Sequence, residues 1–269
     1  MKALLIGDVV GRPGRAAVER FVVPLREECD VDVVIINCEN AAGGAGVTPA
    51  VAEELFLAGA DALTSGNHVW KKKEAFDLLR RDHRVIRPAN YPERAPGFGS
   101  CVVETLSGLK VGVLNLIGRA FMEPVDCPFR AAERELARLR LVTPIILVDM
   151  HGEATSEKVA MGWFLDGQVS CLFGTHTHIP TADERILPKG TAYLTDVGMT
   201  GPYDSVLGRR TDQILERFLS GVPMRADVAE GNVQLHALLV EIDEATGKAL
   251  TVQRFKKVLD APVRDAARD

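Results

Sequence analysis

The sequence predicts an α/β protein in which mixed sheets are combined with helices. Short apolar runs alternate with longer amphipathic stretches along the chain, a pattern typical of strands joined by helices. Two further pairs of apolar runs are separated only by short turn-forming segments, which predicts β-hairpins and therefore antiparallel as well as parallel pairing. No repeat, low-complexity tract or linker divides the chain, so we expect one domain over residues 1–269, with a fraying tail after Ala261.

The expected elements follow from these runs in chain order. Strands are predicted at residues 3–6, 31–36, 61–64, 111–116, 144–148 and 169–173. Helices are predicted at residues 15–28, 72–81, 130–141 and 155–164. Another helix begins at Thr48, because threonine can cap a helix and Pro49 suits its first position. Hairpins are predicted at residues 100–116, turning at Ser107 and Gly108, and at residues 233–256.

Polar residues suited to metal binding follow five of the predicted strands. They are, in order, Asp8, Glu39, Asn40, Asn67, His68, His151, His176 and His178. Four of the chain's six histidines belong to this set. In open α/β sheets, sites form just outside the carboxyl ends of the strands, so side chains far apart in the sequence can converge there. We therefore expect these residues to form one site.

The donor atoms in this set favour a metal site that acts on phosphate. Carboxylates, amide oxygens and imidazoles all bind manganese, iron or zinc. A carboxylate has two oxygens, so Glu39 could bridge two ions. Two metals roughly 3.5–4 Å apart can clamp a phosphate and activate a water molecule. Because Asp8 and Glu39 are the only carboxylates of the set, two divalent ions would leave it positively charged and attractive to an anionic ester.

Each of these residues also has a purely structural interpretation. Asp8 alone would more often cap a helix or form a turn after the first strand. Asn40 precedes Ala-Ala-Gly-Gly and is a natural turn former, and a single histidine such as His151 is more often structural. The closely spaced His176 and His178 are hard to explain by packing. It is the set as a whole that favours ligation.

Four further features near these motifs have two interpretations each. Glu153 could orient a ligand histidine or could be a carboxylate in the first turn of the following helix, and the second is favoured. Arg12 and Arg15 could contact a substrate phosphate, but exposed positions at the start of a helix are favoured. Residues 195–201 could line the pocket or form a structural turn, with neither favoured.

The motifs resemble those of a known superfamily. Asp8, Asn67-His68, His151 and residues 174–178 are similar to the GD, GNH, lone H and GHxH motifs of the calcineurin-like metallophosphoesterases. The resemblance is narrower still to the YmdB-like phosphodiesterases, through the blocks GDVVGRPGR, NCEN with AAGG behind it, SGNHVW, DMHGEATSEK, GTHTHIPTAD and TDVGMTGPYDSVLG. Together these blocks extend from the first strand to about Gly208.

Two departures from the superfamily pattern are shared with the YmdB-like group. Val10 stands where the superfamily has a ligand histidine, and Glu39 replaces its bridging aspartate. The resemblance then implies a di-iron-type centre, with manganese as the alternative metal. One ion would be held by Asp8, Asn40 and His178, the other by Asn67, His151 and His176, and Glu39 would bridge them.

The resemblance also implies a fold and an activity. The fold is a four-layer α/β/β/α sandwich of two mixed sheets flanked by helices. The activity is hydrolysis of phosphate diesters, with 2′,3′-cyclic nucleotides as the expected substrates. A metal-bound hydroxide would attack phosphorus, and His68 would be the general acid that protonates the leaving oxygen.

The net charge, hydropathy and cysteine content of the chain indicate which partners and which compartment such an enzyme would have. A net charge of −5 argues against a stable complex with nucleic acid. The apolar runs are too short to span a membrane, and the five scattered cysteines favour reduced thiols, so we expect a cytoplasmic protein. A homo-oligomer is an open alternative, with the closing hairpin as an interface.

Two other functions remain open at this point. The first is a regulator that binds metal and nucleotide without turnover. A pure binder has no need of an acid next to Asn67, so His68 favours the enzyme. The second is a hydrolase of carbon–nitrogen bonds, since histidine and carboxylate metal sites also serve amide chemistry. Two metals bridged by Glu39 favour phosphate.

Overall fold

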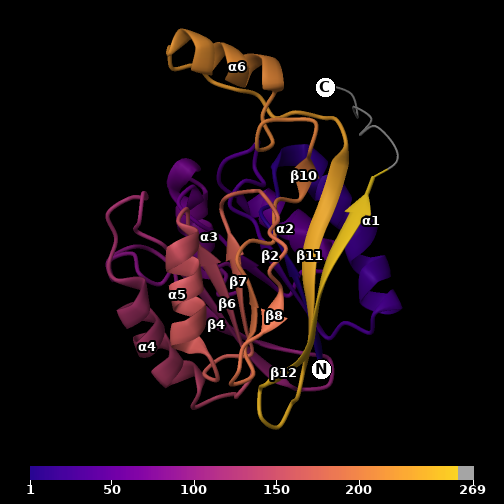
Figure 1. Cartoon of the computed structure of the whole chain (residues 1–269), viewed down its shortest axis with the longest axis vertical. Coiled ribbons are helices and arrows are strands. Elements are labelled where there is room, and N and C mark those ends of the chain that lie inside the picture. Colours follow the sequence, from indigo (N-terminus) through magenta and orange to yellow (C-terminus); the bar gives the residue numbers. More distant parts are fainter. Residues whose placement is uncertain (260–269) are drawn as a thin grey trace.

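Two six-stranded mixed sheets make up the centre of the fold. Figure 1 shows the strands at the centre, with helices α4 (Pro128–Leu139) and α5 (Thr155–Leu165) on one side and α1 (Gly11–Glu28) on the other. The computed structural model describes residues 1–259. The tail expected to fray after Ala261 lies outside the described residues. Both parallel and antiparallel pairs occur in each sheet, so the predicted mixed α/β class is confirmed.

The first sheet combines the amino-terminal strands with the closing hairpin. Its strand order is β10-β11-β1-β2-β3, and β12 pairs with β11. Strands β1, β2 and β3 are parallel, whereas β11 runs antiparallel to β1 and to β12. The bounds are β1 Lys2–Ile6, β2 Val33–Asn37, β3 Ala62–Thr64, β10 Gly201–Pro202, β11 Val233–Ile242 and β12 Ala249–Val258.

The second sheet is built from the middle of the chain. Its order is β4-β5-β6-β7-β9-β8, with a parallel centre and antiparallel strands at both edges. The bounds are β4 Ser100–Glu104, β5 Lys110–Ile117, β6 Ile146–His151, β7 Cys171–Thr175, β8 Arg185–Ile186 and β9 Ala192–Leu194. Strands β4 and β5 form the first predicted hairpin, which is therefore confirmed.

Three buried apolar layers hold the sheets and helices together. In β1, Leu5 faces the other sheet and packs with Val113 and Phe173, whereas Leu4 and its neighbours on the opposite face pack against helix α1. On the far side of the second sheet, a third layer joins it to α4 and α5 through residues such as Leu136. The order of layers is thus α/β/β/α, as the family resemblance implied.

The helices begin for reasons that are largely visible in the sequence. Thr48 caps α2, since its hydroxyl accepts a bond from the Val51 backbone N–H at 3.3 Å, with Pro49 at the first position. The expected helix at 72–81 is wrong at its start, because a short 3₁₀ turn, η1, precedes α3. The bounds are α1 Gly11–Glu28, α2 Pro49–Leu57, η1 Val69–Lys71, α3 Ala75–Arg81, α4 Pro128–Leu139, α5 Thr155–Leu165 and α6 Thr211–Ser220.

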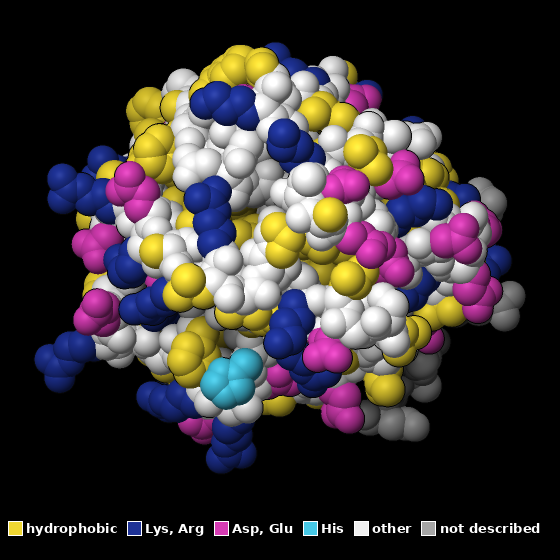
Figure 2. Space-filling model, turned by 90° about the horizontal axis from the view of Figure 1, so that it is seen from below, with side chains coloured by type: hydrophobic (Ala, Val, Ile, Leu, Met, Phe, Trp, Pro, Cys, Tyr) yellow, Lys and Arg dark blue, Asp and Glu magenta, His cyan; other side chains and the backbone are white. Residues whose placement is uncertain are grey.

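Helix α6 was not predicted, and it stands apart from the layers in Figure 1. Only Ile214 of its residues is buried, while Phe218 and Leu219 are exposed. Its apolar residues nevertheless stand at helical spacing (Ile214, Leu215, Phe218 and Leu219), so the sequence did contain a signal for this helix. At the opposite end of the molecule, Figure 2 shows a face on which basic and acidic side chains are interspersed. In the part of the chain that the structure describes, no helix has the length and apolarity to cross a membrane.

Candidate metal centre

The eight residues predicted from the sequence meet at one edge of the two sheets. Each lies at or just after the carboxyl end of a strand, namely β1, β2, β3, β6 or β7. These strands belong to different sheets, yet their ends open toward a common space. The set comprises Asp8 after β1, Glu39 and Asn40 after β2, Asn67 and His68 after β3, His151 at the end of β6, and His176 and His178 after β7.

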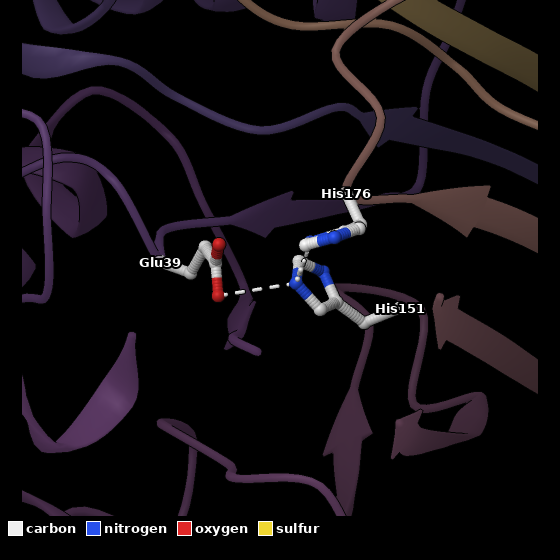
Figure 3. A group of neighbouring side chains, drawn as sticks. All are labelled: Glu39, His151 and His176. Carbon is white, nitrogen blue, oxygen red and sulfur yellow. Dashed lines mark hydrogen bonds and ion pairs between the residues drawn. The ribbon is translucent and has the colours of Figure 1, made fainter. Parts of the chain in front are cut away.

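His151 is the hub of one half of the site. Its Nε2 atom lies 3.2 Å from Glu39 Oε2, 3.0 Å from Asn67 Oδ1 and 3.0 Å from His176 Nδ1. Figure 3 shows Glu39, His151 and His176 pointing toward one another, and each of the three offers one ligand atom within 4.8 Å of the others. His151 and Glu39 are almost completely buried. Four donor atoms therefore face one small volume.

A hydrogen-bond chain behind His151 sets the orientation of its ring. The Thr175 hydroxyl donates to Asp149 Oδ1 at 2.7 Å, so its oxygen is left to accept from His151 Nδ1 at 2.9 Å. With its proton on Nδ1, the imidazole presents the Nε2 lone pair to the cluster. Such outer partners are typical of histidines that bind metals.

The other half of the site centres on Asp8, Asn40 and His178. The Asn40 amide nitrogen lies 3.1 Å from His178 Nε2 and 3.2 Å from Glu39 Oε1. Asp8 is fully buried, and its Oδ2 atom accepts the His176 backbone N–H at 3.0 Å. Its Oδ1 atom has no hydrogen-bond partner among residues 1–259 and lies 3.8 Å from His151 Nδ1, within ion-pair range. A buried carboxylate oxygen left without a hydrogen bond is costly, and this one points to a ligand that the protein itself does not supply.

His68 lies at the rim of the cluster. Its Nδ1 atom is 2.7 Å from Asn40 Oδ1 and 3.3 Å from Glu39 Oε1, and its backbone N–H donates to Glu39 Oε2 at 3.1 Å. About a third of its side chain is exposed, 32% against 1% for Glu39. It can therefore reach both the buried groups and a molecule in the cavity.

The charges in the cluster are strongly coupled. Burial raises the pKa of Asp8. Burial also opposes charge on Glu39, but its contacts with His151 and His68 outweigh burial and hold the pKa of Glu39 well below its usual range. The pKa of His151 is raised to about 9, because Glu39 and Asp8 outweigh its burial. Burial and the charge of His151 lower the pKa of His176 to about 3. Two buried carboxylates thus attract positive charge, which a bound cation could supply in place of a proton.

A buried ion pair braces the turn that carries the last two histidines. His176 and His178 have φ angles of 97° and 66°, a left-handed conformation that is uncommon for non-glycine residues. Asp196 accepts from both the backbone N–H and the hydroxyl of Thr177 between them, and it pairs with Lys158 at 2.6 Å. Lys158 also donates to the Thr175 carbonyl at 2.7 Å. Contacts from Lys158 of α5 and from Asp196 therefore fix this strained turn.

A cavity of about 270 Å³ opens onto the cluster. Glu39, Asn40, His68, Glu153 and residues 176–178 contribute to its wall, together with Val10, Gly44, Leu207 and Arg209. Residues 195–201 are absent from this wall and instead support it through Asp196. Arg209 was not singled out in the sequence, because no motif residue marks it.

The structure corrects the favoured interpretation of Glu153 and excludes the less favoured alternatives for Asp8 and Arg15. Glu153 lies before α5 and its Oε2 atom is 3.0 Å from His176 Nε2, so it contacts a site histidine and is not a helix-turn carboxylate. Asp8 does not cap α1, whose cap position is Val10. Arg15 pairs with Glu54 at 2.7 Å and does not line the cavity.

The chain is similar to known proteins over most of its length. The model of the YmdB-like protein family matches residues 4–255. A 2′,3′-cyclic-nucleotide 2′-phosphodiesterase of Bacillus subtilis (strain 168) is 49% identical over 255 residues, covering 95% of this chain and 96% of that protein.

Two solved structures are also similar over nearly their whole length. A hypothetical protein from Thermus thermophilus superimposes with a TM-score of 0.90 at 41% identity, covering 96% of this chain and 99% of that one. A novel phosphatase from Mycoplasma pneumoniae superimposes with a TM-score of 0.90 at 34% identity, covering 96% of this chain and 93% of that one. The chain belongs to the YmdB-like protein family.

Proposed function

We propose that this protein is a dinuclear metal-dependent phosphodiesterase that hydrolyses 2′,3′-cyclic nucleotides. The observation that carries the proposal is the arrangement of donor atoms around Glu39. One of its carboxylate oxygens faces His151, and the other faces the amide of Asn40, beside His178. A carboxylate placed between two donor groups is suited to bridge two cations.

The residues present fit such a centre. One ion would be held by His151, Asn67 and His176, and the other by Asp8, Asn40 and His178, with Glu39 shared. The unpartnered Oδ1 atom of Asp8 supports a ligand in the second group. In the structure the Asn40 amide nitrogen faces that group, so ligation by its oxygen requires the amide to be turned over.

The glycine at position 66 supports a bound ion beside His151. A Cβ atom at this position would lie 2.2 Å from Glu39 Oε2 and 2.2 Å from His151 Nε2. Any side chain here would occupy the space on which the donor atoms converge. Glycine keeps that space open.

Two bound metal ions would supply neutralisation of the phosphate charge and activation of a water nucleophile. The protein's own contribution to the reaction is His68, which we assign as the general acid. Its imidazole reaches the cavity from the edge of the cluster, where a leaving alcohol would need a proton. Its Nδ1 faces Glu39 Oε1, a contact that does not depend on the orientation of the Asn40 amide, and this leaves Nε2 to face the substrate.

The proposed substrate class rests on the relative from Bacillus subtilis and on the cavity. The cavity is near the lower limit of the range of roughly 300–1,000 Å³ that is usual for ligand pockets. A small diester is therefore favoured over a polymer.

The proposed metal is iron, with manganese as the alternative, as the family resemblance implies, and a donor set made entirely of oxygen and nitrogen is compatible with both. Cys38 is buried, and burial raises the pKa of its thiol, so it offers no thiolate. All five cysteines are free, which supports our placing the enzyme in the reducing cytoplasm.

Elemental analysis of freshly purified protein, combined with assays on bis(p-nitrophenyl) phosphate and a 2′,3′-cyclic nucleotide, tests the proposal. We expect about two equivalents of metal per chain, and turnover that is lost after chelation and restored by added metal. Fewer than two equivalents at saturating metal, with no turnover of either diester, would overturn it and indicate a binding protein.

A further inference from the structure

We infer that Arg209 binds the substrate's phosphate from the side of the cavity formed by the loop before α6. This inference rests on the proposed function and adds an anion-binding residue to it. Among the described residues that line this cavity, Arg209 is the only lysine or arginine. The carboxylates of Glu39 and Glu153 lie on the same wall. Without Arg209, the protein would offer an anionic ester no permanently charged cation there.

Backbone hydrogen bonds shape the turn that carries Arg209 and connect this turn to the metal cluster. Val206 and Arg209 exchange two backbone hydrogen bonds, of 2.9 and 3.0 Å, which close a tight turn. Within this turn the Leu207 carbonyl lies 3.1 Å from His178 Nδ1. One short segment thus orients a proposed metal ligand and carries the arginine.

The guanidinium is anchored by neutral groups only. Its Nη1 atom donates to the Ala226 carbonyl at 3.1 Å, and its Nη2 atom donates to the Gly44 carbonyl. In the described part of the chain, no carboxylate forms an ion pair with Arg209, in contrast to its neighbour Arg210, which pairs with Asp212 at 2.7 Å. A guanidinium has five N–H donors, so donors remain for another acceptor.

The environment of Arg209 favours an anionic acceptor. The side chain is half-buried, and burial together with the nearby Arg225 lowers its pKa. The charge of Asp227 opposes this shift but forms no ion pair with Arg209, so the partly desolvated guanidinium still gains from a bound anion. A phosphodiester presents two non-bridging oxygens that match the planar fork of a guanidinium.

The glycine-rich turn after Asn40 is shaped to admit this side chain. A Cβ atom on Gly44 would lie 2.6 Å from Arg209 Nη1 and 2.8 Å from its Nη2. Gly44 also has a φ angle of +84°, which disfavours other residues. The AAGG motif therefore links the metal cluster to the arginine.

Binding of inorganic phosphate, measured by titration calorimetry on metal-loaded protein, tests the inference without relying on turnover. A hydrogen-bonded charge contact contributes about 1.5–3 kcal/mol, so Arg209→Gln should weaken phosphate binding roughly 10- to 100-fold. Arg209→Lys keeps the charge but loses the fork, and we expect an intermediate loss. Arg210→Gln is the matched control and should bind phosphate like the wild type.

Metal content and thermal unfolding of each variant separate a lost contact from a damaged fold. Phosphate binding by Arg209→Gln within twofold of the wild type, with metal content retained, would overturn the inference. Should that variant fail to fold, Arg209→Lys decides: wild-type phosphate affinity in a folded, metal-loaded Lys variant would overturn it equally.

Kinetics with the four 2′,3′-cyclic nucleotides distinguish the phosphate from the base as the group that Arg209 contacts. A phosphate contact predicts the same fractional loss of kcat/KM for all four in Arg209→Lys. A loss that depends on the base would overturn the assignment. If the wild type hydrolyses no diester, the proposed function fails while the phosphate titration still tests Arg209.

Discussion

Replacing Lys158 by methionine tests whether the buried ion pair holds the metal-centre turn. The side chains of Lys158 and Asp196 are 0% and 1% exposed, so each charge depends on the other. Removing one partner of a buried pair costs about 3–5 kcal/mol, because the remaining charge is left uncompensated. Asp196 would still accept from the Thr177 N–H and hydroxyl and from the Gly198 N–H. We therefore expect a loss near the lower end, about 3 kcal/mol.

Urea unfolding with fluorescence detection measures this loss as a lower midpoint at an unchanged slope. The midpoint should fall by about 1 M for a slope near 3 kcal/mol per M. Because Asp196 holds Thr177 between His176 and His178, we also expect weaker metal binding in the folded variant.

An exposed ion pair provides the matched control. Arg80 and Asp77 form a bridge of 3.0 Å with side chains 59% and 69% exposed, so Arg80→Met should cost less than about 1 kcal/mol. The reasoning is refuted if Lys158→Met loses no more stability than Arg80→Met. If Lys158→Met lowers stability but leaves metal affinity unchanged, the proposed link between the ion pair and the metal centre is refuted.

Three further substitutions probe the centre and the sheet. His68→Ala should reduce kcat on a 2′,3′-cyclic nucleotide roughly 10²- to 10⁴-fold and far less on a p-nitrophenyl diester, whose leaving group needs no proton. Equal losses on both, at normal metal content, would contradict its role as an acid. Gly66→Ala should remove at least one equivalent of metal and cost about 1–3 kcal/mol in urea unfolding, since the added methyl group overlaps Glu39 and His151. Full metal content in that variant would argue against a cation there. Burial and the charges of the neighbouring β12 strand lower the pKa of His236 to about 4, so its contribution to stability is present above about pH 6.5 and is lost as pH falls toward 4. Between pH 7 and 4, wild type should therefore lose about 1–2 kcal/mol more than His236→Gln, and parallel pH profiles would contradict this.

The predicted strands were recovered because buried parallel strands are continuous apolar runs. The runs at 31–36 and 169–173 became β2 and β7 with shifts of one or two residues. The start of α2 was visible because its cap uses neighbours in sequence, Thr48 and Val51. In contrast, β8 and β10 have two residues each, too few to produce a pattern.

The site residues could be predicted because their chemistry is local to the strand ends, where a polar residue interrupts an apolar run. The residues that support this site could not be predicted. Lys158 lies within a helix and Asp196 in a loop, and nothing in either segment indicates that they meet. Glu153 was assigned to a helix turn for the same reason, since only the fold places it beside His176.

By itself the sequence determined the α/β class, the order of the main elements and the set of eight polar residues, because hydrophobic period and strand-end chemistry are properties of short segments. Only the tertiary structure decided which donor atoms share a volume, that Asp8 Oδ1 has no hydrogen-bond partner among residues 1–259, and that Arg209 lines the cavity beside Gly44. These features depend on contacts between residues as far apart as 168 positions, as between Asp8 and His176. Such contacts exist only after the two sheets have packed, and no local pattern encodes them.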